Sequence, residues 1–145
     1  MSHRKATGVG VWGLSDDAGY YSVIHMRPDP NAATPVDDLV ASLCIKLEQA
    51  MAARDDSPRF VTVFTSPGNE EQILEAIHKV VGGGVLIMGG SAADNSVAGE
   101  WSQVSIAGSK DDGFEPPCVS SDGVVVTLGW SVHTQHTNIF VCIYI

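Results

Sequence analysis

The fold is decided by residues 59–90, which read RFVTVFTSPGNEEQILEAIHKVVGGGVLIMGG. The first seven are rich in β-branched and aromatic side chains, a composition typical of a buried strand. Apolar residues then recur at helical spacing over residues 73–81, and three glycines end that pattern. Residues 85–88 form another apolar run, which predicts a second buried strand. Strand, helix and strand joined by short loops predict that the two strands pair in parallel.

A longer helix is predicted before this unit, over residues 36–53. Its apolar residues recur every three or four positions and therefore share one stripe: Val36, Leu39, Val40, Leu43, Cys44, Leu47 and Met51. Thr34 is placed to cap the helix, and Pro35 suits the first turn, where a missing amide donor costs nothing. We expect this stripe to pack against the sheet.

The flanks of the chain predict further strands. Residues 7–12 and 20–26 are short apolar runs separated by a turn-forming segment, so we expect them to pair as a hairpin. Beyond Gly89 the pattern changes to strands without helices, at residues 100–107, 123–130 and 138–145, which should add antiparallel strands to the sheet.

The predicted fold is therefore a single α/β domain over residues 1–145, with residues 1–6 as a flexible N-terminus. Its first half reads strand, helix, strand, helix, strand, and its second half adds antiparallel strands to give a mixed sheet. We expect the two helices to flank the central strands.

Composition limits the classes of partner. The 17 acidic residues against 8 basic ones give a net charge of −9, so a phosphate backbone would be repelled and nucleic-acid binding is not expected. Hydrophobic residues make up 44% of the chain and charged residues 17%, which is poor in charge for an exposed monomer. Part of the surface is therefore expected to face a partner.

Cysteine usage and hydropathy indicate a compartment. Three cysteines, an odd number without a CxxC pair, argue against a disulfide framework and favour a reducing environment. No apolar run has the length needed to span a bilayer, so we do not expect a transmembrane protein. The expectation is an intracellular protein, either soluble or peripherally associated with a membrane.

The candidate ligand site is the glycine-rich segment GGSAADNS at residues 89–96. It follows a strand, at the carboxyl end where α/β sheets place ligands, and its glycines let backbone amides approach an anion such as a carboxylate. Gly89 and Gly90 would bring the backbone close to the ligand, with a positive φ at Gly90, while Ser91 and Asp94 would add hydrogen bonds. The alternative interpretation is a tight turn that needs a positive φ and binds nothing.

No catalytic residue is predicted. The glycine-rich segment lacks the lysine and hydroxyl of a Walker loop and the flanking pattern of a nucleophile elbow, so we expect no enzyme activity. His133 and His136 could join Cys118 in a zinc triad, but a spacing of three sends them to opposite faces of a strand. Histidines in such a polar hairpin are usually solvated, and no metal site is predicted.

Three segments carry a family resemblance: VLIMGGSAADNS (85–96), EWSQVSIAG (100–108) and DGVVVTLGWSV (122–132). Their succession resembles the N-terminal half of FIST domains, which are sensory modules of signal-transduction proteins, over about residues 9–132. The resemblance implies a non-catalytic module that binds a small ligand such as an amino acid. Some FIST domains bind haem, so haem is a candidate cofactor by resemblance, with His25, His78 or His133 as its axial ligand.

The C-terminal run IFVCIYI, residues 139–145, predicts a protein partner. Members of the family continue into a second half, whereas this chain stops at the run. Seven residues without charge or proline are typical of a strand buried on both faces or of an aggregation-prone edge. We expect the run to be covered by a missing C-terminal half, a second copy or another subunit. The alternative function is therefore a FIST-like fold serving as a protein-binding or structural subunit of a larger assembly.

Overall fold

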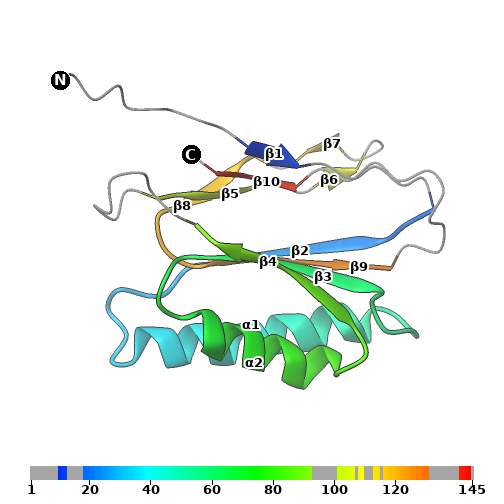
Figure 1. Cartoon of the computed structure of the whole chain (residues 1–145), viewed down its shortest axis with the longest axis horizontal. Helices are drawn as coiled ribbons and strands as arrows, with labels where there is room; N and C mark the ends of the chain where they lie inside the picture. Colours follow the sequence, from blue (N-terminus) through cyan, green and yellow to red (C-terminus); the bar gives the residue numbers. More distant parts are fainter. Residues whose placement is uncertain are drawn as a thin grey trace.

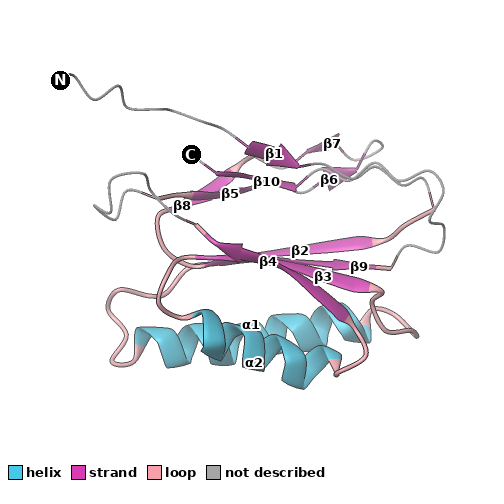
Figure 2. Cartoon of the chain, in the orientation of Figure 1, coloured by secondary structure: helices cyan, strands magenta, loops and turns pink. Residues whose placement is uncertain are grey.

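The computed structural model describes residues 10–12, 18–92, 101–106, 108–109, 113–114, 116–130 and 141–144. These residues form three layers (Figure 1). Two helices lie side by side on one face of a four-stranded sheet, and shorter strand pairs lie over the opposite face (Figure 2). The α/β class is confirmed, but both helices cover the same face of the sheet instead of flanking it.

The four-stranded sheet has the order β2 (Tyr21–Met26), β9 (Val124–Gly129), β3 (Phe60–Thr65), β4 (Leu86–Ser91). β9 is antiparallel to both of its neighbours, while β3 and β4 are parallel, as predicted. Strands β2, β3 and β4 therefore run in the same direction and end at one edge of the sheet. We call this the carboxyl edge; it is formed by Met26, Thr65 and Ser91, with Val124 at the start of β9.

The opposite layer consists of antiparallel pairs: β1 (Gly10–Trp12) with β10 (Val141–Tyr144), β5 (Gln103–Ser105) with β8 (Cys118–Ser120), and β6 (Gly108–Ser109) with β7 (Gly113–Phe114). The second half thus contributes antiparallel strands, as predicted, but among its described strands β9 alone joins the main sheet. The predicted hairpin between residues 7–12 and 20–26 is wrong. β2 pairs instead with β9 along all six residues, because β9 is buried at every position and its backbone groups need partners on both sides.

Both helices form where the apolar spacing places them. α1 spans Pro35–Ala52 with proline in its first turn, and it buries the predicted Leu39, Leu43 and Leu47. Thr34 is the N-cap residue through its backbone: its carbonyl oxygen accepts a hydrogen bond of 3.0 Å from the Asp38 N–H, while its side chain makes no capping bond. α2 spans Glu70–Val81 and ends at Gly82.

The core lies between the helices and the sheet. Leu43 and Leu47 of α1 and Ile77 of α2 have no exposed surface. They pack against alternate residues of the strands, the ones whose side chains point to the helical face: Ile24, Val61, Val63, Val124, Val126 and Leu128. Apolar burial on this face is therefore the main stabilising contribution that the described residues make.

The strand predicted at residues 85–88 is present, but it is longer than predicted and it is not buried. β4 continues through the glycines to Ser91, and it lies at the end of the sheet, where its partner among the described strands is β3. Leu86 and Met88 are 61% and 40% exposed, while Ile87, between them, points toward the helices. An apolar run does not distinguish an edge strand from a central one.

The glycines of β4 lie in a strand and not in the expected turn. Gly89 has the positive φ, 149°, that was expected at Gly90. A Cβ at position 89 would overlap the carbonyl oxygen of Val63, its register partner in β3, whereas a Cβ at position 90 would meet no atom within 4 Å. Close approach of two backbones therefore requires glycine at position 89.

Truncating the centre of the core should cost stability. Leu43→Ala removes a fully buried side chain, so we expect the free energy of unfolding to fall by about 2–5 kcal/mol. Glu48, exposed on the same helix, provides the control, and Glu48→Ala should change that free energy by less than about 0.5 kcal/mol. Urea denaturation measures both; similar losses for the two variants would contradict the assigned packing.

The two glycines of β4 should respond differently to a methyl group. Gly89→Ala should destabilise the fold by about 1–3 kcal/mol or more, because it combines backbone strain with overlap on Val63. Gly90→Ala has space for its Cβ and should stay within about 1 kcal/mol of the parent. Thermal melts followed by circular dichroism separate them, and a Gly89→Ala variant as stable as Gly90→Ala would refute the close approach.

Candidate functional site

The carboxyl edge brings together three elements that each contribute to a site. β3 ends at Thr65 beside the end of β4 at Ser91, and α2 begins at Glu70 after a short connection. Parallel strands with a crossover helix place strand ends and helix N-terminus at the same side of the sheet, which is where α/β folds bind ligands.

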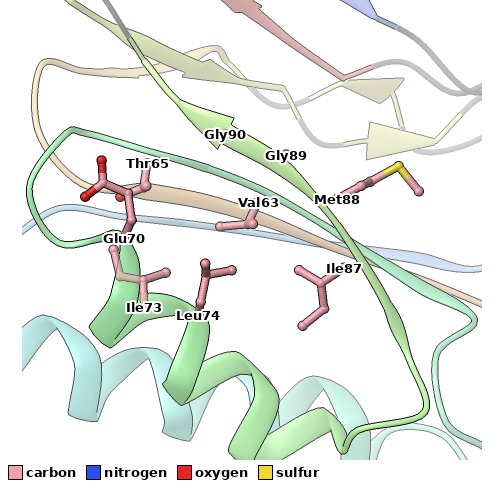
Figure 3. Close-up of a pocket in the computed structure, with 9 residues that line it drawn as sticks. All are labelled: Val63, Thr65, Glu70, Ile73, Leu74, Ile87, Met88, Gly89 and Gly90. Carbon is pink, nitrogen blue, oxygen red and sulfur yellow. The ribbon is translucent and has the colours of Figure 1, made fainter.

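A pocket of about 210 Å³ lies between β3, β4 and α2. Its body is apolar: the side chains of Val63, Ile73, Leu74 and Ile87 point into the space between the sheet and the helix (Figure 3). The remaining lining comes from Thr65, Glu70, Met88, Gly89 and Gly90. Met88 contributes from its backbone side, since its side chain points away from the helices (Figure 3).

Glu70 places a carboxylate at one end of this pocket. Ser91 Oγ donates a hydrogen bond of 2.5 Å to Glu70 Oε1, and the Gly68 N–H donates one of 2.8 Å to Oε2. The Ser91 hydroxyl, and then the backbone N–H groups of Glu70 and Gly68, hold the pKa of Glu70 below its ordinary value. At neutral pH the pocket therefore carries a fixed negative charge.

The sequence-predicted residues are brought together in part. Gly89 and Gly90 line the pocket with their backbone, and Ser91 lies at its end, bonded to Glu70. Asp94 lies outside the described residues.

Glu70 was missed as a site residue, because an acid in the first turn of a helix is an ordinary stabilising feature. The signal that could have found it is its place at the start of the helix that follows a predicted strand, at the carboxyl end of that strand. Among the donors expected to receive an anion, the Ser91 hydroxyl is occupied by the chain's own carboxylate.

A second, larger hollow of about 780 Å³ lies at the β2 end of the carboxyl edge. Arg27, Asp29 and Asp122 line it together with prolines and with residues of the turn between β8 and β9. Both signs of charge occur there, and most of the lining comes from loops. The lining of this hollow therefore does not favour one kind of ligand as clearly as the lining of the first pocket does.

His25 connects the two sheet layers. Its Nδ1 is hydrogen-bonded to Ser105 Oγ at 2.8 Å and its Nε2 to Ser120 Oγ at 2.7 Å, so one hydroxyl donates and the other accepts when the ring is neutral. Burial, and to a lesser extent the positive charge of Arg27, hold the pKa of His25 below its ordinary value of 6.5. Both ring nitrogens are engaged, which argues against His25 as an axial haem ligand.

The other candidate ligands for a metal or cofactor are dispersed or undescribed. His78 is exposed on α2, and Cys118 is exposed on β8. His133 and His136 fall outside the described residues. Within the part of the chain that the structure describes, no three His, Cys, Asp or Glu side chains come close enough to hold a metal ion.

The described residues thus form a three-layered α/β arrangement with a small pocket at the carboxyl edge of its main sheet. The family model of the FIST N domain matches residues 3–141, and the chain therefore belongs to the FIST family, whose members are sensory domains of signal transduction. No curated protein and no solved structure matches the chain. Among the described residues, no helix is both long and apolar enough to cross a membrane.

The contacts of His25 predict a loss of stability in mild acid. Since the folded state lowers the pKa of His25, the unfolded chain binds more protons below about pH 6.5. The contribution of His25 is therefore complete above that pH and is lost as the pH falls through the folded-state pKa. Urea denaturation at about pH 7.5 and about pH 5.5 should show a larger loss for the parent than for His25→Gln. His78→Gln, at an exposed position, should behave like the parent. If His25→Gln lost as much stability between the two pH values as the parent does, the assignment would be contradicted.

Proposed function

We propose that this chain is a non-catalytic sensory module that binds a small ligand in the pocket at the carboxyl edge. The observation that carries the proposal is the pocket itself, an apolar space of about 210 Å³ with one ionised group at its end. This volume lies below the range typical of drug-sized ligands, which favours a metabolite of amino-acid size. Membership of a sensory family supports the same role.

The chemistry of the pocket favours binding over catalysis. A general base works best with a pKa near the operating pH, whereas the hydrogen bonds of Glu70 hold its pKa below the ordinary value of a carboxyl group. The Ser91 hydroxyl donates a hydrogen bond to Glu70, but a carboxylate of lowered basicity is poorly suited to activate this hydroxyl as a nucleophile.

Transmission of the signal would begin at α2 and β4. Ligand contacts with Leu74 and Ile87 would couple the start of α2 to the last strand of the sheet, and both elements reach the surface. A ligand that favours one arrangement of these two elements would change the surface that an output partner meets.

The second candidate function is a protein-binding subunit, and the exposed side chains of β4 favour it. Leu86 and Met88 lie on the face of β4 away from the helices, and Leu74 of α2 is 42% exposed nearby. An exposed apolar strand at the end of a sheet is a site for strand addition by another chain, here a second copy of this one.

Filling the pocket should abolish ligand binding. Leu74→Trp places a larger side chain at the partly exposed wall of the pocket without overpacking the core, and the matched control Ile45→Trp lies on α1, where the parent residue is 54% exposed. We expect the parent and the control to shift their amide NMR signals around Gly68 and Gly90 with small amine, alcohol and carboxylate probes. Leu74→Trp should not respond. If the parent responds to no probe, the sensory proposal falls.

Strand addition should appear as concentration-dependent association. Light scattering after size-exclusion chromatography should show dimers of the parent, and Leu86→Lys should remain a monomer because a charge on the edge strand opposes pairing. Ile106→Lys, at a position 47% exposed in the other layer, should associate like the parent. A parent that stays monomeric at high concentration would exclude a second copy as the partner.

A further inference from the structure

We propose that the pocket at the carboxyl edge selects a small protonated amine with a compact apolar body and without a carboxylate. This proposal rests on the proposed function, because it names the chemical class of ligand for the same pocket. It goes against the expectation of an anion at the glycine-rich segment, and three observations carry it.

The first observation is the charge of the lining. Of the nine residues that line the pocket, Glu70 is the one with an ionisable side chain, and no lysine, arginine or histidine stands among them. A negative charge with no cation in the lining attracts a cationic group, and the net charge of −9 on the chain adds a favourable field for cations.

The second observation is the state of the hydrogen-bond donors. Two donors at this end of the pocket, the Ser91 hydroxyl and the Gly68 N–H, already donate to Glu70. An anionic ligand would therefore compete with a carboxylate that is part of the protein and would also be repelled by it. An ammonium group brings its own donors, and the two oxygens of a carboxylate have more acceptor positions than these two bonds use.

The third observation is the apolar body of the pocket. Val63, Leu74 and Ile87 offer no polar side-chain group, so they match a hydrocarbon segment of the ligand. At the ~30 Å³ that a water molecule occupies in the liquid, the volume of about 210 Å³ corresponds to on the order of seven water molecules. A ligand with one ammonium head and about five carbon atoms would fill it.

Four probes with the same hydrocarbon body separate these features. Isoamylamine carries the ammonium group alone, leucine carries both ammonium and carboxylate, isovalerate carries the carboxylate alone, and isoamyl alcohol is uncharged. Titrations followed by the amide signals of Gly68 and Gly90 should rank isoamylamine first, about tenfold or more above the alcohol, because the alcohol can donate one hydrogen bond to Glu70 but lacks the positive charge. Leucine should bind more weakly than the amine, and isovalerate weakest.

Two matched variants identify the carboxylate responsible. Glu70→Gln should weaken isoamylamine binding about tenfold or more and leave the alcohol nearly unchanged. Glu71→Gln removes the same charge from the same helical turn at an exposed residue outside the pocket, so it should bind the amine like the parent. If Glu70→Gln fails to fold, the salt dependence of the parent replaces it: amine affinity should fall between about 0.02 M and about 0.5 M salt, while alcohol affinity should not.

The outcomes distinguish the amine preference from the proposed function, which is ligand binding in this pocket. Tighter binding of isovalerate or leucine than of isoamylamine would overturn the amine preference and leave the ligand pocket standing. Equal binding of the amine and the alcohol would overturn the role of Glu70. If none of the four probes shifts the Gly68 and Gly90 signals, the pocket does not bind ligands of this size, and the sensory proposal fails together with the inference.

Discussion

The rest of the structure depends on the insertion of β9 between β2 and β3. All six residues of β9 are buried, and its antiparallel pairing on both sides makes β2 and β3 run in the same direction, which β4 shares through its parallel pairing with β3. At its start the insertion is fixed by reciprocal bonds: the Ser66 N–H donates to the Gly123 carbonyl, and the Gly123 N–H donates to Ser66 Oγ. Because of this arrangement the strand ends, the start of α2 and the pocket share one edge of the sheet. The apolar side chains of β9 also complete the face of the sheet on which both helices pack.

Local patterns in the sequence predicted the elements, whereas their long-range placement required the structure. The stripe that holds Leu43 and the unit at residues 59–90 follow from spacing that a single segment contains, and both are confirmed. The partner of β2 was predicted wrongly because several apolar runs are equally able to pair with it, and the choice depends on total burial. The exposure of Leu86 was unforeseen for a similar reason, since β-branched and aliphatic runs occur at the edges and the centres of sheets alike.

Glu70 illustrates how one side chain can serve the fold and the site together. Its carboxylate closes the connection between β3 and α2 through Gly68 and ties α2 to the end of β4 through Ser91. An acid at the start of a helix is also favoured by the helix dipole, so local stability alone would retain it. Sequence reasoning therefore could not separate the two roles. The feature that supports the proposed role in the site is position, because this carboxylate lies at the end of an apolar pocket.

The place of β9 in the chain also governs the order in which the protein can be assembled during synthesis. β2, α1, β3, α2 and β4 leave the ribosome before β9 is made, so β2 and β3 then have no strand between them. A nascent first half can pair β3 with β4 and cover one face with helices, but the gap next to β3 exposes backbone groups that any extended segment can occupy. Completion of the sheet is a late and non-local event, of the kind that makes folding slow. The interval before β9 emerges is therefore the period when the chain is most open to mispairing.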